Sequence, residues 1–262
     1  LIGYRQSGSA GALTIVPAAT NPFTVTGLNP STSYEFYVKD SCAAGDVSVW
    51  SILATGSTLC GVATAPWSEN FDGGAWVEGT GFGNTGNLVN SCWSRPSANN
   101  PNFGTGSGTT VSGNTGPDQD VSGTGNYIYT ESSGGASGAG EIITPSIYIP
   151  ASLSNPRLRF SYHMFGSDIT SLAFQIDDGT GFGTNVKTIT GQQQTSNTAT
   201  WILDSISLSA YADDTIRVKI IGTNSGFRGD IAVDEVNIVS DPVTCAGPSN
   251  ISFTAITPTG FT

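Results

Sequence analysis

The chain has 262 residues, a formal net charge of −11 and only 11% charged residues, of which nine are Lys or Arg. So few cations argue against nucleic acid or an anionic membrane surface as a partner, and no stretch is apolar enough to insert into a bilayer. The 34 glycines, with many Thr, Ser and Asn between short apolar runs, are typical of an all-β protein rich in turns.

The first segment, residues 1–59, is expected to consist of short strands. Apolar alternation predicts strands at Ile2–Arg5 and Leu13–Val16. Leu28 is then followed by a turn containing Pro30 and, six residues after the leucine, by Tyr34. This spacing predicts a tyrosine corner, in which a phenol fixes a turn of a β-sandwich. The segment resembles the second half of a fibronectin type III domain, whose first two strands have no counterpart here.

The last segment, residues 242–262, carries the complementary pattern. Its stretch Cys245–Ile256 resembles the opening strand of a fibronectin type III domain and the approach to the second strand. One interpretation is a unit of a longer tandem array. Another is a polymer, in which residues near Cys245–Phe253 of one chain complete the open sandwich of the next by strand addition. An arbitrary fragment is the third alternative.

The middle segment, residues 60–241, is expected to form the largest domain. Apolar and polar residues alternate in four stretches: Arg157–Tyr162, Leu172–Ile176, Thr215–Ile221 and Ile231–Ile238. Alternation gives each strand one buried and one solvated face, which predicts two packed antiparallel sheets in a jelly-roll sandwich. The Gly/Asn/Ser/Thr-rich residues 98–124 are expected to be mostly loop.

Several separated motifs of the middle segment resemble one family. They are Gly116-Pro117-Asp118-Gln119-Asp120 with the strand Gly125–Ser132, then Leu158–Gly166, and finally Gly229–Val236. In this order they resemble the MAM domain, and the resemblance extends roughly from Cys60 to Ser240. It implies an extracellular β-sandwich used in adhesion or recognition.

The four cysteines are Cys42, Cys60, Cys92 and Cys245. An even number in a chain of secreted character favours disulfides over metal ligation. The MAM resemblance implies a local Cys60–Cys92 disulfide within the chain. Cys42 and Cys245 belong to opposite ends of fibronectin-type modules, so we expect Cys42 to pair with the Cys245 equivalent of a neighbouring unit.

Carboxylates suggest a structural calcium site. By resemblance, Asp72, Asp120, Asp230 and Asp234 match acidic positions of the family, and Asp118 is a further candidate; Val121 stands where the family usually has His. Asp230 and Asp234 are four residues apart in a predicted strand and should share a face, where a cation would offset their repulsion. The alternative is that these carboxylates are solvated or bonded to backbone amides.

The sequence gives little support for catalysis. His163 is the only histidine, and in its context, Tyr162-His163-Met164, the MAM resemblance implies a structural role. A single histidine rules out an HExxH motif. Paired carboxylates of the kind that cleave glycosides remain possible by residue type, but the main acidic cluster is already assigned to an ion. We therefore expect a protein that is not an enzyme.

Two kinds of sugar contact remain open. Trp76, Phe82 and Phe103 lie in loop-like sequence and could stack on a glycan, the alternative being that they cap the sandwich. Ser205 and Thr215 lie in Asp204-Ser205-Ile206 and Asp214-Thr215-Ile216, which resemble the short O-glycosylation signal of Bacteroidetes bacteria.

Together these patterns predict a non-catalytic, extracellular or cell-surface module, a unit of a bacterial adhesin or filament. Its partners would be neighbouring copies or repeats of itself, and surface glycans or host and matrix proteins. The alternative is a carbohydrate-binding accessory region of a secreted polysaccharide-degrading enzyme or protease.

Overall fold

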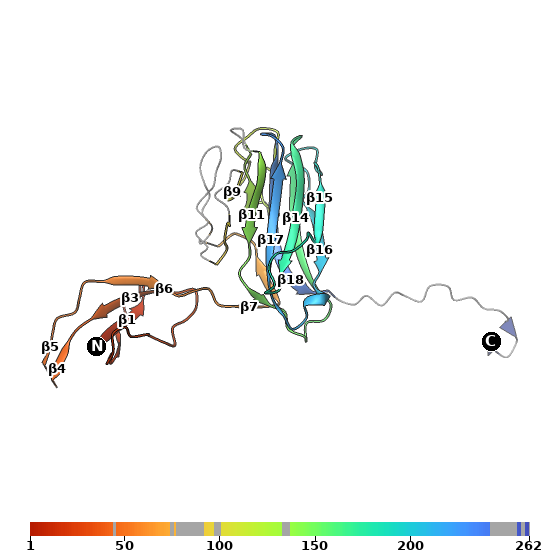
Figure 1. The fold of residues 1–262 in the computed structure, drawn as a ribbon. Coiled ribbons are helices and arrows are strands. Elements are labelled where there is room, and N and C mark those ends of the chain that lie inside the picture. The colour runs from red at the N-terminus through yellow and green to blue at the C-terminus, as the bar shows by residue number, and fades with distance from the viewer. Residues whose placement is uncertain are drawn as a thin grey trace.

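The computed structural model describes residues 1–43, 46–73, 76, 92–96, 101–132, 137–241, 256–257 and 260–261 (Figure 1). Strands make up nearly all of the regular structure in these ranges. The remainder is the short 3₁₀ helix η1 at Ser209–Tyr211. Among the described residues, no helix has the length and apolar character needed to cross a membrane. The fold is all-β, as the composition predicted.

The N-terminal sheet has four antiparallel strands in the order β2-β1-β3-β6. Its strands are β1 Ile2–Gln6, β2 Thr14–Val16, β3 Ser33–Val38 and β6 Ala54–Ser57, and a hairpin of β4 Ser41–Ala43 and β5 Asp46–Val47 follows β3. The predicted tyrosine corner is present, because the backbone N–H of Asn29 donates to Tyr34 Oη at 3.0 Å.

The central sandwich consists of two sheets, and the first has the order β16-β13-β18-β10-β9, with β8 also paired to β18. Its strands are β8 Trp67–Glu69, β9 Phe103–Ser107, β10 Asn126–Thr130, β13 Pro156–Phe165, β16 Ile202–Ser207 and β18 Asp230–Ser240. Strand β9 lies within the stretch that we expected to be mostly loop. The glycines of β9 weaken the sequence signal for a strand. In the structure Gly106 leaves room for the ring of Tyr129, because a Cβ at this position would lie only 2.8 Å from that ring.

The second sheet has the order β15-β14-β17-β12-β7, with β11 also paired to β17. Its strands are β7 Ala63–Thr64, β11 Gly138–Ile143, β12 Ile147–Tyr148, β14 Ile169–Asp177, β15 Lys187–Thr190 and β17 Thr215–Asn224. The short pair β19 Ile256–Thr257 and β20 Gly260–Phe261 lies near the C-terminus.

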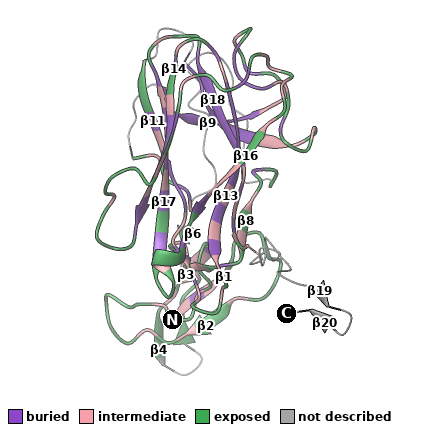
Figure 2. Cartoon of the chain, turned by 90° about the vertical axis from the view of Figure 1, so that its right-hand side faces the viewer, coloured by how far each residue is buried: buried purple, intermediate pink, exposed green. Residues whose placement is uncertain are grey.

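The core fills the space between the two sheets of the central sandwich, where buried residues concentrate (Figure 2). Phe160 of β13 and Phe174 of β14 meet across it with ring centroids 4.1 Å apart. Every second residue of the long strands points inward, which is the alternation that the sequence shows.

Strand β18 contains a bulge that changes this alternation. Ser161 of β13 pairs with Asp234, whereas Arg159, two residues earlier, pairs with Asn237, so β18 has one residue more than β13 over this stretch. Glu235 adopts a φ of 50° at that point. The bulge keeps both Val233 and Val236 in the core, and it leaves Asp234 on the outer face.

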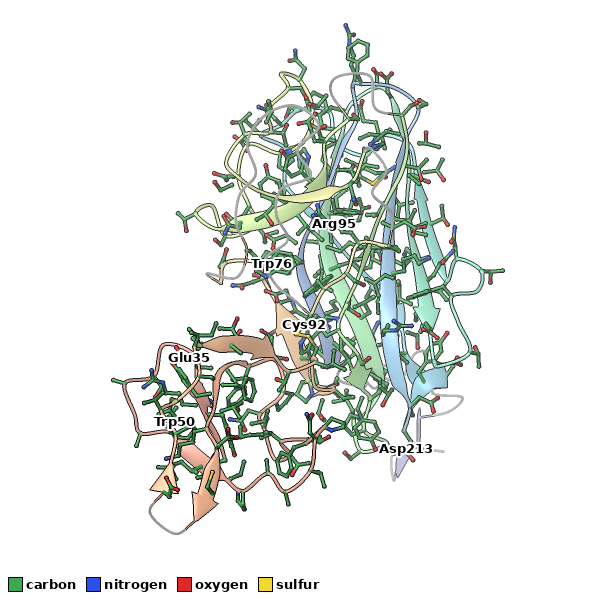
Figure 3. The ribbon with its side chains drawn as sticks, turned by 60° about the vertical axis from the view of Figure 1, so that its left-hand side comes forward. Glu35, Trp50, Trp76, Cys92, Arg95 and Asp213 are labelled. Carbon is green, nitrogen blue, oxygen red and sulfur yellow. A yellow bond between two sulfur atoms is a disulfide. The ribbon has the colours of Figure 1, made fainter. Side chains whose placement is uncertain are left out.

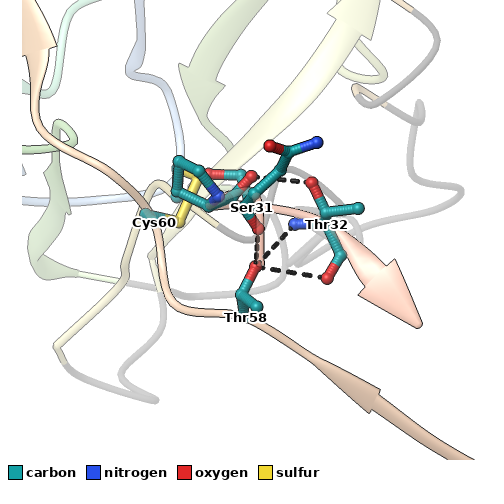
Figure 4. Close-up of a disulfide and its surroundings, with 7 residues drawn as sticks. Ser31, Thr32, Thr58 and Cys60 are labelled. Carbon is teal, nitrogen blue, oxygen red and sulfur yellow. Dashed lines mark hydrogen bonds between the residues drawn. A yellow bond between two sulfur atoms is a disulfide. The ribbon is translucent and has the colours of Figure 1, made fainter. Parts of the chain in front are cut away.

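A disulfide joins Cys60 to Cys92 next to the N-terminal sheet, as the family resemblance implied (Figure 4). Ser31 Oγ lies 3.2 Å from Cys92 Sγ, and Thr58 Oγ1 donates to the carbonyl of Asn29 at 2.6 Å. The turn of the tyrosine corner is therefore held against the disulfide that begins the central sandwich.

Candidate functional site

The outer face of the first sheet carries most of the polar candidates. Facing away from the core are Ser161 and His163 on β13, Asp230, Ala232 and Asp234 on β18, and Tyr127 and Tyr129 on β10. The segment between β9 and β10, residues 108–125, contacts this face, since Tyr127 Oη donates to the carbonyl of Gly108 at 2.6 Å. Most of these outward side chains are consequently buried.

Asp234 is the carboxylate most affected by this cover. It is 1% exposed, and its Oδ2 accepts the backbone N–H of Val121 at 3.0 Å. The pKa of Asp234 is raised to about 7, chiefly by burial and to a lesser extent by the nearby charges of Glu235 and Asp120, while the backbone hydrogen bonds from Val121 and Glu235 lower it. A positive charge placed here would relieve the cost of ionising the group.

The carboxylates of Asp72 and Asp120 both lie against Gly125, where no side chain would fit. A Cβ at Gly125 would lie 2.6 Å from Asp120 Oδ2 and in direct contact with Asp72 Oδ1. Asp120 is 3% exposed, its Oδ2 accepts the hydroxyl of Ser122 at 2.6 Å, and its buried Oδ1 has no hydrogen-bond partner. Asp72 Oδ1 accepts the backbone N–H of Asn126 at 2.7 Å.

The other two predicted ligands lie elsewhere. Asp230 is four residues from Asp234 along the same face of β18, which at strand geometry is about 13 Å. Its Oδ2 accepts the hydroxyl of Thr115 at 2.7 Å, and burial beside Glu131 raises the pKa of Asp230 to about 6. Asp118 borders a hollow on the surface instead. The structure thus brings Asp72, Asp120 and Asp234 to one loop but separates Asp230 from them.

The residues around Gly125 fit calcium in kind, because carboxylates and backbone carbonyls of a loop are the ligands that calcium prefers. The buried Oδ1 of Asp120, which has no hydrogen-bond partner, and the approach of two carboxylates to Gly125 are both consistent with a bound cation. Within the described part of the chain, however, no three His, Cys, Asp or Glu side chains converge closely enough to hold a metal ion as they stand. Calcium therefore remains a proposal.

The predicted glycan-contacting aromatics do not form a surface. Trp76 is 4% exposed and packs edge-on against Phe71 and Trp93, with ring centroids 4.8 and 5.5 Å away (Figure 3). Phe103 is fully buried on β9. Both belong to the core because β8 and β9 close the sandwich there, so neither ring can stack on a sugar. Phe82 lies outside the described residues.

A hollow of about 410 Å³ lies beside an aromatic residue that the sequence analysis did not select, Trp201. We call it the Trp201 hollow; its lining residues are Asp118, Gln119, Asp120, Val121, Ser161, Thr198, Ala199, Thr200, Trp201 and Leu203. Trp201 is half-buried just before β16, and its ring contacts His163 and Tyr127. The mostly polar stretch 192–200 that precedes Trp201 gave no signal that this ring stands at the rim of a sheet.

His163 lies beneath Trp201 and is fully buried, with ring centroids 5.7 Å apart. Burial lowers the pKa of His163 to about 4, so the ring is neutral at physiological pH. A buried neutral imidazole packed against an indole fits the structural role that the sequence implied.

The N-terminal sheet has one apolar face that is only partly covered. We call it the open face; it carries Ile2, Tyr4, Val16, Tyr34, Phe36 and Val38, as the strand register places them on one side. The rings of Tyr4, Tyr34 and Phe36 lie 6.2 Å apart along it. Val38 is 53% exposed, and a hollow of about 660 Å³ borders Ile2 and Val38. The opposite face is covered in part by Trp50, labelled in Figure 3, which packs on Gly3.

The remaining predicted residues are two cysteines and two hydroxyl residues. Cys42 is exposed and has no disulfide partner among the described residues, and Cys245 lies outside them. Thr215 is exposed at the start of β17, whereas the hydroxyl of Ser205 is half-buried and accepts hydrogen bonds from Arg157 Nε and Nη2 at 3.0 and 2.8 Å. Of the two, Thr215 is the more accessible to a glycosylating enzyme.

The family model described as MAM domain, meprin/A5/mu matches residues 84–246. The chain belongs to the MAM domain family. Solved structures similar to it include the K2 cleaved adhesin domain of Lys-gingipain, with a TM-score of 0.42 and 14% identity over 67% of this chain and 98% of that chain. The K3 cleaved adhesin domain of Lys-gingipain from Porphyromonas gingivalis W83 has a TM-score of 0.35 and 16% identity, covering 55% and 91%.

A family 11 carbohydrate-binding module from Clostridium thermocellum, in complex with a mixed-linked tetrasaccharide, has a TM-score of 0.35 and 17% identity, covering 57% of this chain and 89% of that chain. Because these likenesses are distant, membership rests on the family model. The MAM match begins at residue 84, whereas the sandwich also includes β7 and β8, which pair with β12 and β18.

Proposed function

We propose that this chain is a non-catalytic, extracellular adhesion or structural module that assembles with neighbouring copies or repeats of itself. The observation that carries the proposal is the open face of the N-terminal sheet. A single four-stranded sheet leaves this apolar face without a second layer, and a β-sandwich is stable when both inner faces are covered. MAM domains are extracellular, which agrees with this role.

The occupant of the open face would be the segment after Asp241 of a neighbouring unit. Its sequence Asn250-Ile251-Ser252-Phe253-Thr254-Ala255-Ile256 alternates apolar and polar residues, as an added strand requires. The tyrosine corner supports the view that residues 1–59 are part of a fibronectin type III module, which this strand would help to complete. Strand addition would also bring Cys245 of one unit toward the exposed Cys42 of the next.

Two residues of equal exposure allow a matched test. Val38 is 53% exposed on the open face, and Ile15 is 52% exposed on the opposite face of the same sheet. A synthetic peptide of residues 245–262 should bind the chain and its Ile15→Glu variant in calorimetry, and it should not bind Val38→Glu. Equal binding to both variants, or none to the unmodified chain, would refute strand addition.

We also propose that calcium stiffens the sandwich at the loop that carries Asp120. Asp72, Asp120 and Asp234 would contribute oxygens, with backbone carbonyls of the loop completing the set. Saturation at 100 times the dissociation constant would stabilise the fold by about 2.7 kcal/mol. Thermal unfolding in the presence of calcium and in the presence of EGTA measures this stabilisation. Asp120→Asn should lose the rise in unfolding temperature that calcium causes, whereas the control Asp178→Asn, which changes an exposed carboxylate, should keep it. If calcium still raises the unfolding temperature of Asp120→Asn, the calcium site is not at this loop.

A carbohydrate-binding accessory role is the second candidate. The aromatics first assigned to it are buried or outside the described residues, but the Trp201 hollow offers a different site on the MAM sandwich. The two candidate functions use different surfaces and can be tested separately.

A further inference from the structure

The walls of the Trp201 hollow are fixed by hydrogen bonds between separate segments. The backbone N–H of Asp118 donates to the carbonyl of Asn197 at 3.1 Å, and Trp201 Nε1 donates to the carbonyl of Gln119 at 3.0 Å. Asp234 Oδ2 holds the backbone N–H of Val121 on the far side. Because the hollow is formed before any ligand arrives, binding would lose little conformational entropy.

The lining alternates apolar and hydrogen-bonding surface. Leu203 is 64% exposed and Val121 40%, next to the indole of Trp201. The same hollow is also lined by Thr198, Thr200 and Ser161, which carry hydroxyls, and by Asp118, which carries a carboxylate. A pyranose ring has an apolar C–H face and a rim of hydroxyls, so it can place its face on the apolar groups and donate from its rim to the oxygens.

The charges narrow the class of sugar. None of the described residues that line the hollow is Lys or Arg, so an acidic glycan would find no cationic partner. Asp120 is 3% exposed and its Oδ2 already accepts from Ser122, which leaves Asp118 as the accessible carboxylate. A single carboxylate among hydroxyls and apolar groups is a good acceptor for the hydroxyl groups of a ligand. It is a poor site for a cationic ligand, because that ligand would lose its hydration and gain only one charged partner.

We propose that the Trp201 hollow is a binding site for a neutral oligosaccharide, with Leu203 and Trp201 against the ring face and Asp118 accepting from its hydroxyls. The inference rests on the carbohydrate-binding candidate above. It is independent of self-assembly, because the hollow and the open face are formed by different sheets.

Calorimetric titration of the chain with cellotetraose, laminaritetraose, mannotetraose and galactotetraose tests the proposal. At least one should bind. Two variants should each weaken binding about tenfold or more. Leu203→Glu places a charge on the apolar part of the hollow, and Asp118→Asn removes the accepting charge while keeping the shape of the side chain. The control is Val186→Glu, which puts the same charge on an equally apolar exposed position, 41% exposed and next to β15 on the other sheet.

Thermal unfolding of each variant verifies that it is folded, and Asp118→Asn provides the test should Leu203→Glu unfold. The proposal is overturned if no oligosaccharide binds, or if both variants bind as tightly as the unmodified chain. The proposal is also overturned if the chain binds heptalysine but no sugar, and if Asp118→Asn abolishes that binding, because the hollow would then be a site for cations. None of these results depends on whether the peptide of residues 245–262 binds the N-terminal sheet.

Discussion

Removal of the Cys60–Cys92 disulfide should lower the stability of the central sandwich by a predictable amount. The two cysteines are 32 residues apart in sequence. In the chain-entropy description, a cross-link across a loop of this length stabilises the fold by about 3.5 to 4 kcal/mol, because it restricts the unfolded chain. The Cys60→Ser/Cys92→Ser double variant should lose this amount, which is a large share of the 5 to 15 kcal/mol typical of a domain.

Urea unfolding followed by tryptophan fluorescence measures the effect, because Trp93 adjoins Cys92 and packs in the core with Trp67 and Trp76. The matched control is Cys42→Ser, whose thiol is exposed and forms no disulfide in the described structure, and which should leave the unfolding midpoint unchanged. A loss below about 1 kcal/mol in the double variant would refute the entropic reasoning, as would an equal loss in Cys42→Ser.

Three further changes have defined outcomes. Gly125→Ala should destabilise the chain by about 1 to 3 kcal/mol, because the new Cβ would meet Asp72, whereas Gly183→Ala, with open space around it, should be near neutral in the same urea titration. Tyr34→Phe should cost about 1 kcal/mol through the lost tyrosine-corner hydrogen bond, and an unchanged unfolding midpoint would contradict that role. Burial lowers the pKa of His163 to about 4, so the unfolded chain binds a proton at this histidine more tightly than the folded chain does. The free energy of unfolding should therefore be at its full value above pH 6.5 and should fall by about 3 kcal/mol as the pH approaches 4. The difference between the unmodified chain and His163→Gln over this pH range isolates the contribution of the histidine.

The long strands could be predicted because alternation alone specifies a half-buried strand. The predicted Thr215–Ile221 and Ile231–Ile238 fall within β17 and β18. The bulge at Glu235 is also visible afterwards in the sequence, as two consecutive polar residues between Val233 and Val236. Strand β9 could not be predicted, because glycine weakens the sequence signal for a strand and Gly106 is needed only to make room for the ring of Tyr129 on another strand.

The candidate site was predictable only in part. Spacing placed Asp230 and Asp234 on one face, which is correct, but a shared face of a strand does not bring two carboxylates to one ion when they are four residues apart. Trp76 and Phe103 resembled loop residues because their neighbours are glycines and polar residues. Their burial depends on how β8, β9 and the disulfide close the sandwich, and that is a matter of tertiary packing. The same holds for Trp201, whose half-buried position depends on its contact with the segment that carries Gln119.

The chain joins the sandwich and leaves it at the same end. Strand β8 pairs antiparallel with β18, with Trp67 opposite Ile238, so the first strand of that sheet lies beside the last one. In Figure 1 the N-terminal sheet reaches the sandwich at that lower end. Tension from the N-terminal side would reach Cys60 first, and the disulfide would pass it on to Cys92, so β8 lies inside a closed covalent loop that tension cannot pull out. If such units stand in a stretched array, the β8–β18 pairing would therefore be shielded from unzipping, and the disulfide would limit how far the MAM sandwich extends at this end.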